Sequence, residues 1–430
     1  MKFVTAIFLT AILCVEPALA LPAPSVSDSR AQAPAQKQDE IDRLWGLVAA
    51  PRLSRLPASA EEFYNYSELL MVPLHAAFQF KRPDWQQAFA DHFAKVVANP
   101  SALPSVMLDR LGYLYFASEF VRLARNADHL DLIPKGLPEL LYSEIDSTWK
   151  SKPAWMWERP AFHGARERVI WKLETRNTPH GYYRVIFDDD LFLIAIAADM
   201  KVYTRGIAEL PWAPTLNDVL NVSYKVFNQE VEWRSDGTWL FQPGVFADHP
   251  EYMYAGNPEV RPGMKPAPVR GISLDSSHSL RYPLWLTSQV DAFPEGSEQR
   301  AYFVRMKEGL NTEFFSKVVV PPDSNMPCYR LNNFLDGSNG VYRYNYASLG
   351  AGHGYGPYGL SNALLVGWWA FLETPQSREL YQNLAKQFPW PKECIDLYLG
   401  PAGVHPADAY APGSGSMRMW HFLVELDSRF

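Results

Sequence analysis

The chain has 430 residues and a formal net charge of −7, with acidic and basic residues interspersed along it. This balance excludes the basic footprint of a nucleic-acid-binding domain and long-range attraction of polyanions, although a local basic groove remains compatible with it. The 14 Trp and 22 Tyr residues serve either to pack a core or to stack on flat faces of a ligand such as a sugar ring.

The first 20 residues, MKFVTAIFLTAILCVEPALA, contain a lysine, an apolar run and a small-residue ending. This pattern predicts a secretory signal peptide with cleavage after Ala20. The alternative, a membrane anchor, needs about 20 apolar residues, and Glu16 and Pro17 interrupt this run. Residues 21–40 hold almost no large apolar side chain, so we expect a flexible leader there. The mature protein is thus expected to be secreted, and without a membrane partner.

Residues 41–430 show no second linker, which favours one domain. Helical spacing predicts two helices over 61–97, broken near Pro73 or Lys81-Arg82-Pro83. Further helices are expected at 105–126, 136–149, 186–203, 215–229, 276–293, 297–317, 358–374, 376–388 and 416–427. Strand-like alternation is confined to short pieces such as 317–320 and 341–346. So many helices with long connections indicate an all-α protein, specifically an (α/α)6-type toroid; an irregular helical domain is the alternative.

Cys14 lies in the signal peptide and is removed with it, so Cys328 and Cys394 remain. In an exported protein two cysteines most simply form a disulfide. Two buried unpaired thiols are the alternative. Asn65 and Asn221 each begin a glycosylation sequon, which a eukaryotic host would use. The sequence does not address the oligomeric state.

Polar groups concentrate beside aromatic residues in two early segments. Trp157 and Glu158 lie in one of them, and we expect both to contact substrate. In the other, Asp188-Asp189-Asp190 precedes an apolar helix. Capping of the helix and interaction with its dipole explain about two of these three acids without a catalytic role. The remaining acid is a candidate acid–base group, for which we choose Asp189.

Two later segments complete the candidate site. The aromatic loop at 239–254 contains Asp248, placed to orient His249, and Tyr252; a solvent-facing turn is the alternative for this Asp-His pair. The stretch SLDSSHSLRYPLWLTSQVDAF at 273–293 begins with polar groups and ends as an apolar helix. The glycine-rich segment 350–359 lets the backbone approach a ligand closely. The expected participants from these last regions are Asp275, His278, Arg281, Asn345, His353 and Tyr355.

No cofactor or metal is expected. The glycine spacing is not that of a dinucleotide or phosphate loop, and HExxH and the DxDxDG calcium spacing are absent. A serine nucleophile would want G-x-S-x-G, which is also absent.

The run Ser277-His278-Ser279-Leu280-Arg281-Tyr282-Pro283-Leu284-Trp285-Leu286 resembles a motif of the family-eight glycoside hydrolases, roughly Tyr-Asp-Ala-x-Arg-x-Pro-Leu-Tyr-Leu. The resemblance implies an inverting enzyme on an (α/α)6 toroid with a sugar cleft. It covers ten residues, and His278 stands where that family has aspartate. That family's Ser-Glu-Gly motif with the general acid has no counterpart. Asp275 is a candidate replacement for the base, or else an N-cap.

These features favour a secreted glycoside hydrolase that uses acid–base catalysis on a carbohydrate. The candidate catalytic residues are Asp275, Asp248, Asp189, His278 and His353. A polysaccharide lyase that performs β-elimination on a uronate is the main alternative, since it explains His278 better. A toroid resembling linalool dehydratase-isomerase, or a non-catalytic binding domain, ranks behind both.

Overall fold

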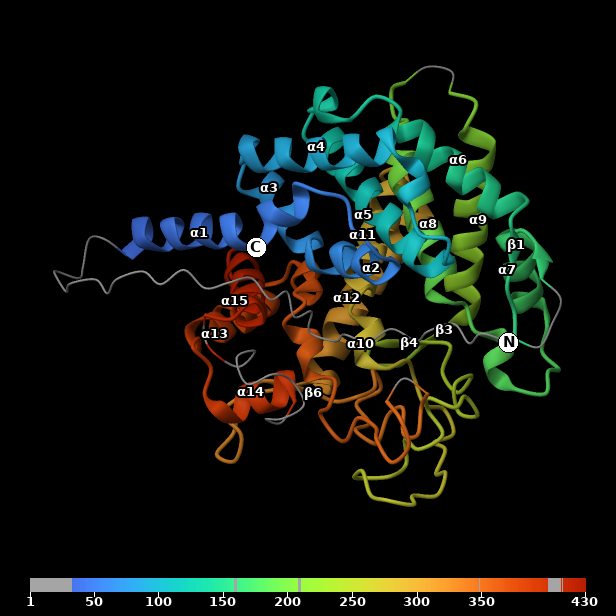
Figure 1. Ribbon diagram of the computed structural model, residues 1–430. Helices are drawn as coiled ribbons and strands as arrows, with labels where there is room; N and C mark the ends of the chain where they lie inside the picture. Colours follow the sequence, from blue (N-terminus) through green and yellow to red (C-terminus); the bar gives the residue numbers. More distant parts are fainter. Residues whose placement is uncertain (1–32, 158–160, 208–209, 348, 401–410, 412) are drawn as a thin grey trace.

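The computed structural model describes residues 33–157, 161–207, 210–347, 349–400, 411 and 413–430 (Figure 1). The protein is mostly helical there. Its α-helices are α1 (Ala33–Leu53), α2 (Ala60–Leu69), α3 (Met71–Gln79), α4 (Pro83–Ala98), α5 (Met107–Asn126), α6 (Leu137–Lys150), α7 (Ala165–Glu174), α8 (Asp188–Tyr203), α9 (Ala213–Glu230), α10 (Ser276–Ser279), α11 (Tyr282–Ala292), α12 (Glu298–Glu313), α13 (Pro375–Lys386), α14 (Lys392–Leu399) and α15 (Gly415–Asp427).

Strands are short and form only two-stranded antiparallel ladders within these residues. They pair β1 (Pro153–Ala154) with β2 (Phe162–His163), β3 (Val231–Trp233) with β4 (Trp239–Phe241), and β5 (Val319–Val320) with β6 (Arg330–Leu331). The short turns are η1 (Pro100–Ala102), η2 (Leu130–Leu132), η3 (Gly181–Arg184), η4 (Phe314–Val318), η5 (Ser361–Leu364) and η6 (Trp368–Leu372).

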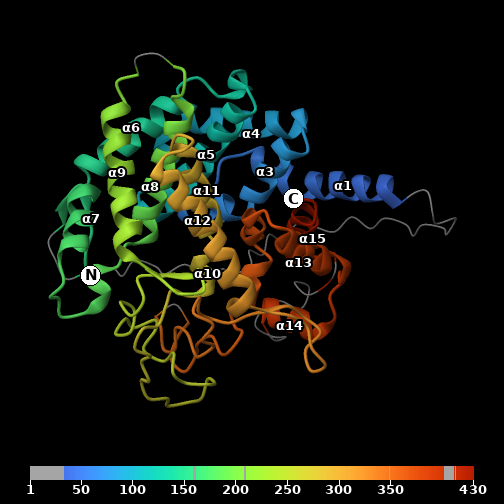
Figure 2. The ribbon, with the colours of Figure 1, turned by 180° about the vertical axis from the view of Figure 1, so that it is seen from behind.

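Three helices, α5, α8 and α11, pack side by side and run in the same direction. Near their starts Phe192 of α8 contacts Tyr115 and Trp285, and near their ends Arg122 of α5 pairs with Asp199 and Asp291. Each is followed in the chain by a further helix that packs against this group: α6 against α5 and α8, α9 against α8, and α12 against α11 (Figure 2). We call the end at which α5, α8 and α11 begin the mouth end.

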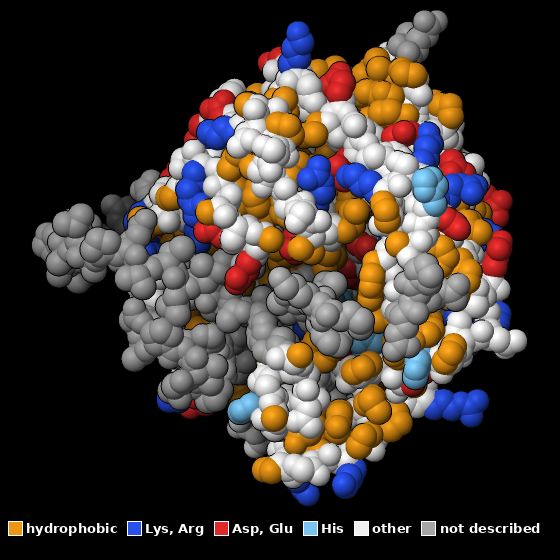
Figure 3. Space-filling model, turned by 45° about the vertical axis from the view of Figure 1, so that its right-hand side comes forward, with side chains coloured by type: hydrophobic (Ala, Val, Ile, Leu, Met, Phe, Trp, Pro, Cys, Tyr) orange, Lys and Arg blue, Asp and Glu red, His pale blue; other side chains and the backbone are white. Residues whose placement is uncertain are grey.

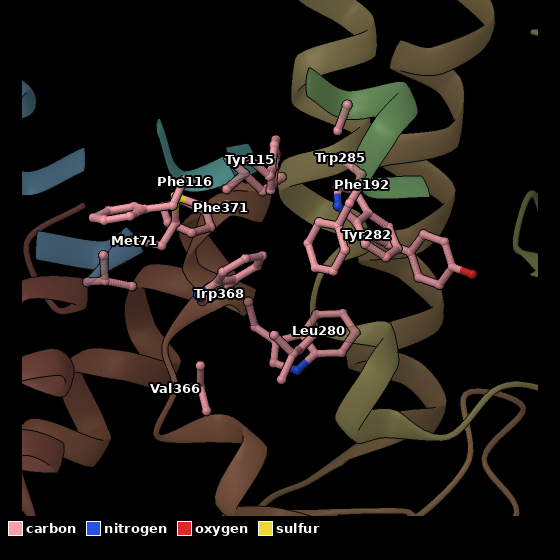
Figure 4. Packing of buried hydrophobic residues seen from close by; sticks show 14 of the residues in the cluster. Met71, Tyr115, Phe116, Phe192, Leu280, Tyr282, Trp285, Val366, Trp368 and Phe371 are labelled. Atoms are coloured by element: carbon pink, nitrogen blue, oxygen red, sulfur yellow. The ribbon is translucent and has the colours of Figure 1, made fainter. Parts of the chain in front are cut away.

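Buried apolar side chains from Ile41 to Phe430 form one continuous core cluster. Part of it lies where α8 and α11 face the segment at η6 (Figure 4). There the ring of Phe192 contacts that of Trp285, and Trp368 lies nearby. At roughly 1.5–3 kcal/mol for each fully buried large apolar side chain, this cluster is the main source of stability. Among the described residues, none of the helices combines the length and apolar character needed to cross a membrane.

Two long loops cover the mouth end, where Figure 1 shows them below α10. The loop after β4 and the loop after β6 are joined by backbone hydrogen bonds, including Arg343 N–H to the Glu251 carbonyl at 2.9 Å and Val341 N–H to Asn257 at 3.0 Å. A Cβ on Gly340 would lie 1.7 Å from the Ala255 carbonyl oxygen, so only glycine permits this approach. The loops therefore form one packed layer over the ends of the helices.

Several predicted elements need correction. The segment 358–374 is not an α-helix but the two 3₁₀ turns η5 and η6, and left-handed Gly367 at φ +93° and Glu373 at φ +58° lie at the two ends of η6. The expected helix at 276–293 divides into α10 and α11, and Pro283 lies in the first turn of the second, which begins at Tyr282. Residues 61–97 form three helices rather than two, because the chain breaks at Leu70, just before Pro73, and again at 80–82, just before Pro83. The piece at 341–346 makes a single bridge, Tyr342 to Tyr355, rather than a strand.

The start of the chain is only partly described. The signal peptide and residues 21–32 lie outside the described residues, whereas α1 begins at Ala33, inside the segment expected to be a flexible leader. The disulfide between Cys328 and Cys394 is confirmed, with Cα atoms 5.5 Å apart. Asn65 is buried at 7% exposure within α2, which leaves no room for a glycan, while Asn221 is exposed on α9.

Candidate functional site

Asp275 and His278 form a hydrogen-bonded pair at the start of α10. Asp275 is fully buried, and its carboxylate accepts from the backbone N–H groups of Ser277 and His278 at 3.1 Å, which caps the helix. The same carboxylate lies 2.8 Å from His278 Nδ1 and accepts from the Tyr252 hydroxyl at 2.7 Å. Asp275 therefore fixes both the helix start and the orientation of the imidazole.

The charges of this pair stabilise each other. Burial alone would raise the pKa of Asp275, but the attraction of His278 and the hydrogen bonds hold it far below its usual range. Burial opposes a charge on His278, yet the Asp275 carboxylate raises the pKa of the imidazole above its ordinary value. The His278 side chain is 20% exposed, and within the described residues its Nε2 atom makes no hydrogen bond. This nitrogen is available to a ligand.

A second carboxyl group, Asp188, lies close enough to His278 for each to shift the other's pKa. Its Oδ2 atom accepts from Arg281 Nη1, and its side chain is 18% exposed. Burial raises the pKa of Asp188 above its ordinary value, although Arg281 and His278 oppose the rise. Oδ1 has no hydrogen-bond partner among the residues that the structure describes, so one carboxyl oxygen is free.

Arg281 is the anchor that holds Asp188. Its guanidinium is 2% exposed and also donates to Glu68 Oε1, at 2.9 Å from Nε, and to the Tyr64 hydroxyl. Because the guanidinium group binds residues of α2 and the first residue of α8, it joins two helices across the mouth end. Arg281 is too enclosed to bind a ligand itself; its role is to position the Asp188 carboxylate.

The loop layer supplies a third buried pair. Glu251 accepts from the Tyr342 hydroxyl at 2.6 Å and lies 3.0 Å from Arg343 Nε. Burial opposes the negative charge, but Arg343 lowers the pKa of Glu251 to about 2. The rings of Tyr342 and Tyr355 stack at 6.2 Å, so Tyr355 is placed beside this pair.

An aromatic wall, defined here as Trp155, Trp157, Tyr182, Phe187 and His249, continues from the site toward solvent. Trp157 lies 5.7 Å from His249 and 5.3 Å from Trp155 between ring centroids. His249 contacts Tyr252 at 5.9 Å, and burial lowers its pKa below the ordinary value. Figure 3 shows acidic and histidine side chains in a depression on this face, bordered by hydrophobic side chains.

The structure thus gathers Asp275, His278, Arg281, Tyr252, His249, Trp157 and Tyr355. The other expected residues are held elsewhere. Asp248 is exposed and accepts from Gly181 N–H at 2.9 Å, and Asp189 pairs with Arg168 at 3.1 Å. Asn345 holds its own loop by accepting from Gly352 N–H at 2.6 Å, and His353 lies exposed in that loop. Glu158 lies outside the described residues.

Sequence analysis missed the acid that faces the site. Of the three adjacent acids, Asp190 accepts from Phe187 N–H at 3.0 Å and from Lys172 at 2.8 Å, which leaves Asp188 rather than Asp189 for the mouth end. Only the triplet itself was a signal, and it could not say which member turns inward. Glu251 and Arg343 gave no signal, because they meet only when the two loops pack.

Neither metal nor known relatives add to this description. Among the residues described, no group of three or more His, Cys, Asp or Glu side chains is placed to hold a metal ion. No family model matches the chain, and no curated protein or solved structure matches it either.

Proposed function

We propose that this protein is a glycoside hydrolase that cleaves a carbohydrate by acid–base catalysis at His278 and Asp188. The observation that carries the proposal is the pairing of a partly exposed imidazole, backed by buried Asp275, with a partly exposed carboxyl group that has one free oxygen. Glycoside hydrolysis requires one group to protonate the leaving oxygen and a second group to activate water or attack the sugar.

The surroundings of His278 and Asp188 determine which of them acts as the acid and which as the base. His278 has a raised pKa, so it is the group that carries a proton to the leaving oxygen. Asp188 has a raised pKa too, but the ordinary pKa of a carboxyl group lies well below that of an imidazole, and we assign Asp188 the ionised role. Asp188 is therefore the base that takes a proton from water through its free Oδ1. Asp275 acts through His278 by keeping the imidazole charged and oriented, as buried carboxylates do in other acid–base sites.

The charge around these groups favours a neutral substrate. The buried or half-buried charges next to His278 are those of the carboxylates Glu68, Asp188, Glu251 and Asp275 and the guanidinium groups Arg281 and Arg343. With protonated His278 counted, four carboxylates face three cations, and both guanidinium groups are already paired. A uronate would find the guanidinium groups already paired and protonated His278 as the cation with a free donor in this cluster, and the net negative charge of the cluster would oppose its binding.

The finer fold assignment, an (α/α)6-type toroid, belongs to the same proposal. It is supported by the parallel course of α5, α8 and α11 and by the packing of α6, α9 and α12 against them. In such a fold the loops at one end of the inner helices build the site, which matches the position of Asp188 and α10. Export through the signal sequence at residues 1–20 is likewise proposed from the sequence alone.

β-Elimination by a polysaccharide lyase is the second candidate. It is favoured by the Asp275–His278 pair and by Tyr355, since an imidazole or phenolate base removes the proton next to a uronate carboxylate. Elimination needs His278 in its neutral form, which the raised pKa of the imidazole disfavours. The paired state of Arg281 and Arg343 also leaves the uronate charge without a partner.

A product assay on purified protein separates the candidates. The protein is incubated with neutral and uronic-acid polysaccharides, and new reducing ends and the ultraviolet absorbance of unsaturated products are recorded. Reducing ends without absorbance are expected. Both signals together would establish elimination, and neither signal on any substrate would contradict carbohydrate cleavage.

A further inference from the structure

The indole of Trp155 is the most exposed of the large apolar side chains noted in the described part of the chain. It is 49% exposed, although a tryptophan of this size normally gains from burial. It stands at the outer end of the aromatic wall, whose inner end, His249, interacts electrostatically with His278. Neither Trp155 nor the outer half of this wall takes part in the proposed acid–base chemistry.

Trp155 is also held rigidly relative to the site. Its backbone carbonyl accepts from Arg168 Nη1 at 2.9 Å, and the same guanidinium pairs with Asp189 and Asp190 in the first turn of α8. That turn begins with Asp188. The ring of Phe187, one residue before Asp188, lies 6.0 Å from Trp155 and 4.5 Å from Trp157. A ring stacked on Trp155 is therefore kept at a constant position relative to the Asp188 carboxylate.

From this arrangement we infer that Trp155 is a stacking subsite for a second sugar ring of a neutral chain, so that the substrate is an oligosaccharide or polysaccharide rather than a single-ring glycoside. This inference rests on the proposed function. An exposed indole face binds the C–H face of a neutral sugar without needing charge, which agrees with the paired state of the guanidinium groups of Arg281 and Arg343 at the site. Trp157, set at 67° to Trp155, forms the corner at which the chain turns toward His278.

Affinity electrophoresis tests the inference without requiring turnover. Full-length mature protein runs through native gels that contain soluble β-glucan, xylan or starch, and each mobility is compared with that in a gel without polysaccharide. Retardation is expected in at least one gel. Trp155→Ala is expected to weaken it on the order of tenfold in apparent dissociation constant, whereas Trp155→Phe keeps most of it.

Leu130→Ala is the matched control. Leu130 is 41% exposed and follows the C-terminal end of α5, opposite the mouth end, so its removal changes exposed apolar surface but not the wall. Retardation that depends on Trp155 supports the subsite even if no polysaccharide is cleaved, in which case only the hydrolase proposal fails. Cleavage of a polysaccharide with unchanged binding and KM in Trp155→Ala would overturn the subsite and leave the hydrolase standing. Absence of both binding and cleavage in every gel overturns both.

Discussion

One carboxylate, that of Asp275, both caps α10 and lies 2.8 Å from Nδ1 of His278. In the sequence a catalytic base and an N-cap were the alternatives for Asp275. The structure shows that its side chain caps the helix and also contacts the imidazole of His278. The imidazole sits only three residues after the cap, so the turn that the cap closes also presents the ring. Fold and candidate chemistry are therefore coupled at this residue.

Asp275→Asn tests this coupling. Asparagine remains a good N-cap, so folding is expected to survive, but the negative charge opposite His278 is lost. The pKa of His278 then falls, because burial is no longer offset. Since His278 must be protonated to act, the basic limb of the pH–rate profile moves to lower pH and the maximal rate drops about 100-fold or more. A profile that keeps the wild-type basic limb would contradict the role of Asp275.

Asp188→Asn removes the group assigned to activate water. The expected loss in kcat is on the order of 100- to 10,000-fold. Azide, an anion that needs no deprotonation, should restore part of the rate on a substrate with a good leaving group. Asp189→Asn serves as the matched control because its carboxylate pairs with Arg168 instead. Equal losses in the two variants would show that Asp188 has no special role.

Arg281→Ala is expected to destabilise the fold. It leaves Glu68 and Asp188 as buried or half-buried charges without their partner, which costs about 3–5 kcal/mol. Arg281→Lys restores the charge but not the fork that reaches both carboxylates and Tyr64, so it should recover only part of the loss. Urea unfolding measures both values. An unchanged free energy of unfolding in Arg281→Ala would contradict the anchoring role.

Acid should weaken the loop layer through Glu251. Its pKa falls from 4.5 to about 2 on folding, so its stabilising contribution is complete above its unfolded pKa of about 4.5 and is lost as the pH falls toward 2. The shift corresponds to at most about 3 kcal/mol. Glu251→Gln should therefore flatten the dependence of the unfolding free energy on pH in this window. A slope equal to that of the wild type would contradict the lowered pKa.

The Cys328–Cys394 disulfide closes a loop with a sequence separation of 66 residues. Restricting the unfolded chain by such a loop contributes about 4 kcal/mol in the chain-entropy model. The Cys328→Ser/Cys394→Ser double variant should unfold at a lower urea concentration, and a reducing agent should change the wild type but not the variant. Equal midpoints for both proteins would show that the bridge adds no stability.

Much of the helical architecture could be predicted from the sequence, but the site only in part. Apolar periodicity located α5, α8 and α9 because tertiary packing and local spacing agree there. It failed at 358–374, where two left-handed residues interrupt an apolar run, a backbone property that composition does not reveal. Asp275 and His278 lie close together in the chain and both were named as candidates, but their hydrogen bond was not predicted.

The remaining site residues depend on long-range contacts. Arg281 meets Glu68, 213 positions away, and Glu251 meets Tyr342, 91 positions away. Spacing rules describe only neighbours within a turn or strand, so neither contact left a pattern. The sequence could not separate Asp188 from Asp189 for the same reason, since Asp188 pairs with Arg281 of another segment and Asp189 with Arg168.

Proton transfer by His278 on a carbohydrate is tested most directly by the rate of reducing-end release. The wild type, His278→Ala and His353→Ala are compared on the same neutral polysaccharide. His353 lies exposed in its loop and serves as the comparison. We expect a loss of about 100-fold or more in His278→Ala and a near wild-type rate in His353→Ala. Equal rates in His278→Ala and wild type would contradict it.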